Sequence, residues 1–116
     1  MGTSGSADDR RWTAHAEVYS GRPDPSWVLQ PEDVAALKAL WTAMKPFAGL
    51  RPRPPRLGYR GCHITQPGGR SFIYRGAVTL TAGRSTESRA DVDGVFERRV
   101  LASAPTGMIP RALIRR

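Results

Sequence analysis

An apolar stripe between two prolines is the feature that most constrains how this chain can fold. Pro31 stands where a first helical residue would be, Glu32 and Asp33 supply the acidic first turn, and Pro46 stops the helix. Between these bounds, apolar side chains recur at three- and four-residue spacing: Val34, Leu37, Leu40, Trp41 and Met44. The sequence therefore predicts an amphipathic helix over residues 31–45, whose stripe needs a sheet or a second helix to cover it.

Two regions have the alternation of strands. Residues 12–20 place Trp12, Ala14, Ala16 and Val18 on one face and predict a first strand. Residues 57–65 and 71–81 predict a hairpin, because the turn between them offers proline and then two glycines. If Thr65 pairs with Ser71, the core face carries Cys62, Ile64, Phe72, Tyr74, Val78 and Leu80. The opposite face then carries Tyr59, His63, Ile73 and Arg75.

The remaining segments complete an α+β arrangement. A second helix fits residues 91–103 with Val92, Val95, Phe96, Val100 and Leu101 inward, whereas residues 46–56 and 82–90 are predicted to be a connector and a loop. We expect a small antiparallel sheet of three or four strands with two helices on one face. Residues 1–11 are expected to be a disordered N-terminus, and residues 12–116 a single domain. Open sheet edges would allow a peptide or a second copy to pair as a homodimer.

Charge is unevenly distributed along the chain. The formal net charge is +8, and residues 51–116 contribute thirteen basic and four acidic side chains, whereas residues 1–50 contribute five and six. Such a surface attracts anions, including carboxylates, phosphates or an acidic partner. The lone Cys62 excludes an internal disulfide. With no apolar run of membrane length and no apolar signal segment, a cytoplasmic location and no membrane partner are expected.

Catalytic and metal-binding patterns are weak in this sequence. Cys62 and His63 are adjacent, so in a strand their side chains point to opposite faces and cannot act as a nucleophile–base pair. His15, Glu17 and His63 hold the residue types of a two-histidine metal site, but this pattern arises often by chance. No metal and no cofactor is therefore predicted, and whether the chain is an enzyme is left open.

A stiff loop suggests a binding site. Residues 20–27 contain two prolines, with Arg22 and Trp27 beside Tyr19. Arg22 offers a two-pronged donor to a carboxylate, with Trp27 or Tyr19 as an aromatic wall. On the hairpin, Tyr59, Arg60, His63 and Arg75 would extend this peptide-binding site. The alternative is structural: Arg22 bonds carbonyls at a tight turn, and Trp27 covers the core.

Nucleic acid is the other partner that the composition suggests. A basic half with Tyr59, Phe72 and Tyr74 on strands superficially matches a base-stacking sheet. The predicted register buries Phe72 and Tyr74, and lysine is nearly absent from the chain. A nucleic-acid-binding module is therefore kept as an alternative and not as the main hypothesis.

Two short motifs carry a family resemblance. Residues 20–27 are Ser-Gly-Arg-Pro-Asp-Pro-Ser-Trp, and residues 57–61 are Leu-Gly-Tyr-Arg-Gly. They resemble a family of small bacterial proteins common in myxobacteria, with a Ser-Gly-Arg-Pro-Asn-Pro-x-Trp stretch and a later Leu-Gly-Tyr-Arg-Gly stretch. Here Asp24 replaces the asparagine, which adds a negative charge beside Arg22. This family is similar to the paired peptide-binding proteins of crocagin biosynthesis, a ribosomal peptide (RiPP) pathway whose product is a pyrroloindoline.

The resemblance implies a function that composition does not. It implies a peptide-binding accessory protein that recognises a ribosomally made precursor and presents its C-terminal core to tailoring enzymes. A cofactor-free cyclase acting on that peptide is the alternative, with His63, Glu17 and Tyr59 as candidate bases. We hypothesise that the peptide adds as a strand to an open edge while Arg22 and neighbouring arginines hold its carboxylates.

Overall fold

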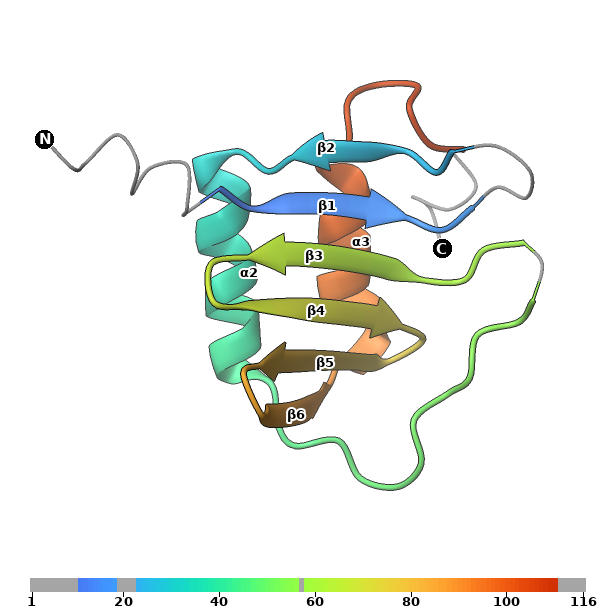
Figure 1. Cartoon of the computed structure of the whole chain (residues 1–116). Coiled ribbons are helices and arrows are strands. Elements are labelled where there is room, and N and C mark those ends of the chain that lie inside the picture. Colours follow the sequence, from blue (N-terminus) through green and yellow to red (C-terminus); the bar gives the residue numbers. More distant parts are fainter. Residues whose placement is uncertain (1–10, 19–22, 57, 111–116) are drawn as a thin grey trace, which may run out of the picture.

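The computed structural model describes residues 11–18, 23–56 and 58–110. It is an α+β fold in which one antiparallel sheet lies in front of two helices (Figure 1). The strands lie in the order β2-β1-β3-β4-β5-β6. In chain order the elements are β1 (Thr13–Ala16), β2 (Ser26–Val28), α2 (Pro31–Ala43), β3 (Cys62–Gln66), β4 (Gly69–Tyr74), β5 (Ala77–Ala82), β6 (Ser85–Ala90), the short 3-10 helix η1 (Val92–Gly94) and α3 (Val95–Ala102).

Within the described residues the sheet has six strands, so the prediction of three or four was too low. The segment 71–81 breaks into β4 and β5 because Arg75 and Gly76 both adopt positive φ, which reverses the chain in a tight turn. The predicted loop 82–90 contains β6, an edge strand with a polar sequence. The sequence of β6 did not indicate a strand, because a largely exposed edge strand needs no alternation of apolar residues.

The predicted hairpin register was also wrong, by one residue. Cys62 pairs with Ile73, and His63 pairs with Phe72, around a shorter turn that brings Gln66 opposite Gly69. Since side chains alternate across a strand, this slip exchanges the two faces of β4. Ile73 is fully buried beneath the helices, whereas Phe72 lies on the open face beside His63.

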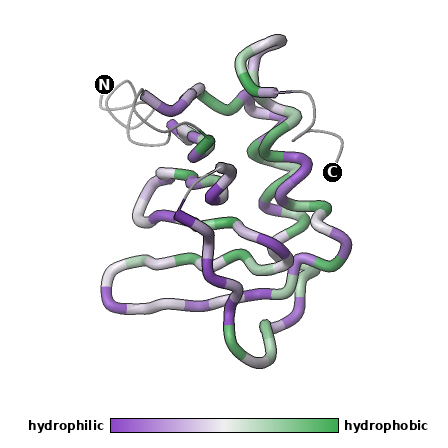
Figure 2. Tube along the Cα trace, turned by 90° about the vertical axis from the view of Figure 1, so that its right-hand side faces the viewer, coloured by the Kyte–Doolittle hydropathy of each residue, from purple (hydrophilic) through white to green (hydrophobic). Residues whose placement is uncertain are grey.

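The core lies between the sheet and the helices, which occupy one side of the strands (Figure 2). Helix α2 confirms the predicted stripe, although it ends at Ala43. It contributes Leu37, and α3 contributes Phe96, Val100 and Leu101. From the sheet come Ala14, Ala16, Cys62, Ile64, Ile73 and Val78.

The start of the second helix departs from the prediction. Val92 and Val95, expected to face inward, are 72% and 42% exposed. Asp91 ends the extended chain, η1 follows, and α3 begins only at Val95. The helix predicted over residues 91–103 therefore starts about one turn before the observed first residue of α3, Val95.

The proline-rich connector lies beside the face of the sheet that the helices leave open. Residues 46–56 pass the β6 edge and lead back towards β3 (Figure 1). Arg51 donates to the Thr79 hydroxyl on β5 over 3.2 Å. Phe47 N–H donates to the Ser88 carbonyl, and Ala90 N–H donates to the Lys45 carbonyl. The connector thus covers part of β6's outer edge. Among the described residues, no helix is long and apolar enough to cross a membrane.

Candidate functional site

Two adjoining hollows form a groove on the open sheet face. One, of about 380 Å³, lies between the connector and the sheet, with Phe72, Tyr74 and Ala77 along the strands. The other, of about 350 Å³, continues towards His63, Arg70 and Thr81. The two hollows share three lining residues, Arg51, Phe72 and Thr79, so they adjoin each other. We call the two adjoining hollows together the groove.

The groove is basic. Arg51 and Arg53 come from the connector and Arg70 from β4, and all three are exposed. None of the described residues that line the groove is acidic. Its aromatic part is limited, because Tyr74 is only 5% exposed whereas Phe72 is partly open. Guanidinium groups above a partly apolar floor suit a ligand with carboxylates and short apolar groups.

A cluster of titratable side chains adjoins the groove at His63. His63 and His15 are cross-strand partners on β3 and β1, and their rings stack with centroids 4.6 Å apart. Phe72 packs against the His63 ring, with centroids 4.8 Å apart. Glu17 bonds the Nε2 atom of His63. Burial, followed by the proximity of His63, lowers the pKa of His15.

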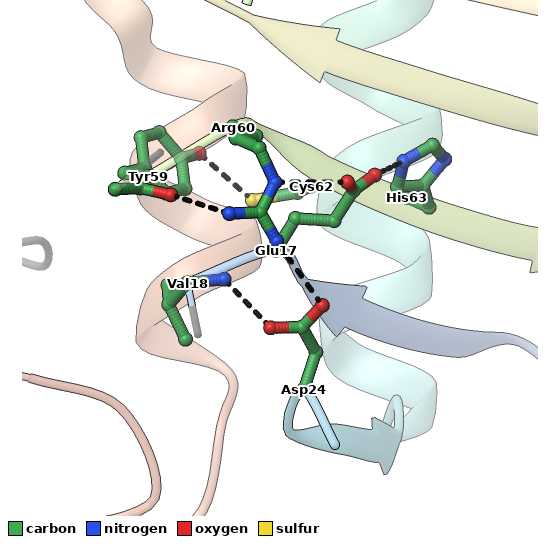
Figure 3. Close-up of polar contacts among 8 residues, drawn as sticks. Glu17, Val18, Asp24, Tyr59, Arg60, Cys62 and His63 are labelled. Atoms are coloured by element: carbon green, nitrogen blue, oxygen red, sulfur yellow. Dashed lines mark hydrogen bonds and ion pairs between the residues drawn. The ribbon is translucent and has the colours of Figure 1, made fainter. Parts of the chain in front are cut away.

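The two sequence motifs meet beside this cluster (Figure 3). Asp24, from the first motif, accepts a hydrogen bond from Val18 N–H at 2.9 Å and lies 3.7 Å from the Arg60 guanidinium. Arg60, from the second motif, also lies 3.5 Å from the Glu17 carboxylate and donates to the Gly58 carbonyl. We call Glu17, Asp24 and Arg60 the motif junction. These charges fix the two loops relative to each other and orient Glu17.

Trp27 and Tyr59, both predicted to bind peptide, make structural contacts. Trp27 is 6% exposed in the core, and its indole N–H donates to the Ser103 hydroxyl at 2.8 Å. The Tyr59 hydroxyl contacts the Cys62 sulfur at 3.1 Å and also donates to Glu97 on α3. Burial raises the pKa of Tyr59 and keeps its hydroxyl protonated. These positions favour the structural alternative for Trp27.

The other predicted residues are dispersed. His63 lines the groove and Arg60 belongs to the motif junction, whereas Arg75 lies in the β4–β5 turn with its guanidinium 5.7 Å from the Tyr74 ring. Arg22 and Tyr19 lie outside the described residues. Sequence reasoning missed Arg51, Arg53, Arg70 and Phe72 as groove residues. The run of arginines and prolines in the connector signalled only Arg51 and Arg53.

Cys62 is expected to be chemically inert in the folded protein. Its side chain is fully buried, and burial raises its pKa to about 12, so very little of the nucleophilic thiolate is present at neutral pH. Native protein should therefore react with Ellman's reagent at pH 8 far more slowly than unfolded protein, which should release one equivalent. Immediate reaction of the native thiol would show that Cys62 is accessible.

Comparisons with known proteins add no family to this description: no protein-family model, curated protein or solved structure matches the chain.

Proposed function

We propose that this protein binds an extended, carboxylate-bearing peptide in the groove on its open sheet face. The observation that carries the proposal is the presence of Arg51, Arg53 and Arg70 around two adjoining hollows without acidic lining among the described residues. Arginine forks bond carboxylates in two parallel hydrogen bonds, and the partly apolar floor would accept side chains between them. The resemblance of the two motifs to crocagin-type peptide-binding proteins favours a ribosomally made precursor as the ligand.

The groove is a better place for the peptide than a sheet edge. At β6, Lys45 and Phe47 already bond the outward-facing backbone of Ala90 and Ser88. The opposite edge, β2, has only three residues, which offers few ladder hydrogen bonds. Three further points stay predictions: presentation of the peptide core to tailoring enzymes, pairing of two copies, and carboxylate recognition by Arg22.

Removing groove arginines should weaken peptide binding without unfolding the protein. We expect Arg51→Ala and Arg70→Ala each to cost about 1–3 kcal/mol of binding free energy, as for a lost hydrogen bond to a charged group. Both side chains belong to exposed residues, so the melting temperature should change little. Calorimetric titration with acidic decapeptides, carrying free or amidated C-termini, measures the effect. Mass spectrometry of the recovered peptide should show no change for a binding protein and a new mass for a cyclase.

A charge-matched control separates local recognition from net charge. Arg98 lies on α3 in the helical layer, where its guanidinium bonds the Asp93 carbonyl. Arg98→Ala removes the same unit charge and should leave peptide affinity nearly unchanged. Equal losses in Arg98→Ala and Arg51→Ala would reduce the proposal to nonspecific attraction between a basic protein and acidic peptides.

Single-stranded nucleic acid is the second candidate, and the corrected register favours it more than the sequence did. Phe72 and His63 lie together on the open face beside Arg51 and Arg70, which is the composition of a stacking platform. The covered ring of Tyr74 leaves only Phe72 and the smaller His63 ring partly open in the groove's described lining, so peptide is preferred. Tight binding of unrelated oligonucleotides that falls steeply with salt, together with weak peptide binding, would reverse this preference.

A further inference from the structure

Three potential metal ligands converge at the β1–β3 pair. One nitrogen from each of His15 and His63 and one carboxylate oxygen of Glu17 all lie within 4.8 Å of one another. All three side chains are partly buried, so they are held by their surroundings and remain reachable from solvent. Two imidazoles and one carboxylate are a ligand set found for first-row transition ions, including Zn²⁺.

The register of the sheet builds this convergence. His15 lies directly opposite His63 in the antiparallel pair, so both imidazoles project from the same face. Glu17 comes two residues after His15, and its backbone continues the ladder through hydrogen bonds to Gly61 and Arg60. An even spacing keeps the carboxylate on the same face as the imidazoles. The one-residue difference from the predicted register concerns the β3–β4 pair, so it does not affect the pairing of β1 with β3.

Neighbouring side chains contact the three ligands and position them. Arg60 contacts one oxygen of Glu17 while the other faces His63, and Phe72 restricts the His63 ring from its far side. Such contacts around a site orient the ligand side chains and tune their affinity.

We propose that His15, Glu17 and His63 bind one divalent first-row transition ion, with Zn²⁺ as the reference case. Coordination at about 2.0–2.1 Å requires ligand atoms roughly 3.3 Å apart in a tetrahedral site. Binding therefore requires the side chains to rotate and to bring the ligand atoms together from the observed spread of up to 4.8 Å. Three protein ligands leave a fourth position for water or for a donor from a molecule in the groove, which His63 also lines. This ion site stands whether or not the groove binds peptide.

Titration of tag-free protein with metal ions alone tests the site. We expect one Zn²⁺ per chain with a dissociation constant of about 10 μM or tighter, and Co²⁺ should give visible absorption bands of low-coordinate geometry. His15→Asn and Glu17→Gln should each weaken Zn²⁺ binding at least about tenfold. Glu87→Gln is the control for lost negative charge, since Glu87 is exposed on β6 and pairs with Arg89.

Circular dichroism and thermal melting should show that His15→Asn remains folded, because His15 contacts its neighbours mainly by stacking on His63. If Glu17→Gln loosens the motif junction, His15→Asn still decides the test. Wild-type binding weaker than about 100 μM would overturn the proposal. So would unchanged affinity in a folded His15→Asn variant, or an equal loss in Glu87→Gln. None of these measurements uses a peptide, so failure here leaves the groove proposal standing.

Discussion

Replacing Gly61 with alanine is expected to destabilise the protein by about 2–5 kcal/mol, since it combines backbone strain with overpacking. Gly61 is buried immediately before β3 with φ of +105°, a conformation that side-chain-bearing residues rarely adopt. An added Cβ would lie 2.8 Å from the Ile73 carbonyl oxygen and 2.9 Å from the Phe72 ring. The carbonyl belongs to the β4 backbone, so the clash is relieved only by moving a strand. Urea denaturation measures the loss.

Gly58 provides the matched control within the same motif. Its φ is also positive, at +80°, but an added Cβ would meet no atom within 4 Å. Gly58→Ala should therefore show the strain alone, about 1–2 kcal/mol. If Gly61→Ala is no more destabilising than Gly58→Ala, Gly61 does not lie as close to the β4 backbone as the structure places it.

The second large effect is expected at the start of α3. Asp91 is 3% exposed, and its two carboxylate oxygens accept the N–H groups of Phe96 and Glu97 at 2.7 and 2.9 Å. N–H groups in the first turn of a helix have no acceptor within the helix. Asp91→Ala therefore leaves these two N–H groups without a partner, next to a core that includes Phe96 and Val100. We expect a loss of about 2–3 kcal/mol in unfolding free energy. Thermal and urea unfolding at pH 7 measure it.

Asp91→Asn separates hydrogen bonding from charge. The amide keeps one acceptor oxygen, so this variant should lose less stability at pH 7 than Asp91→Ala. Burial raises the pKa of Asp91 above its ordinary value of 3.8, although the two N–H bonds oppose the shift. The folded state therefore holds the proton more tightly than the unfolded chain. As the pH falls from 7 to about 4, wild type should gain stability relative to Asp91→Asn. A relative loss would mean that the bonds to the ionised carboxylate outweigh its burial.

The elements with strong local signals could be predicted from sequence, and the strand pairing could not. Pro31 and Pro46 bracket α2 closely, because proline acts on the backbone wherever it stands. The β3–β4 register depends on which side chains the helices cover, and Phe72 and Ile73 are both apolar enough for either face. The observed register buries Ile73, which packs in the core with residues distant in sequence, such as Phe96 and Val100. The polar strand β6 carried no apolar signal at all.

The site shows the same division. The outward direction of His15 and His63 followed from alternation, and so did the burial of Cys62. The partner of His63 did not, because Glu17 lies far away in sequence and meets it only through the β1–β3 pairing. Arg51 could not be placed either, since a connector without regular structure gives no periodicity to read.

The motif junction gives the two motif stretches a structural role. Asp24 and Arg60 stabilise the approach of the loops that carry them, and Glu17 joins them to the histidine cluster. Their charge pair explains why an acidic residue at position 24 is compatible with this fold. Asp24 and Arg60 therefore support the loops that carry the two motifs, whereas the described residues that line the groove lie outside both motifs.

The most direct test of the groove is a nuclear magnetic resonance titration of isotope-labelled protein with an acidic decapeptide. We expect amide shifts to concentrate at Arg51 and Arg53, along Arg70–Tyr74 of β4 and at Thr79, with α2 and α3 nearly unchanged. Shifts confined to the helices or to β2 under saturating peptide would contradict it.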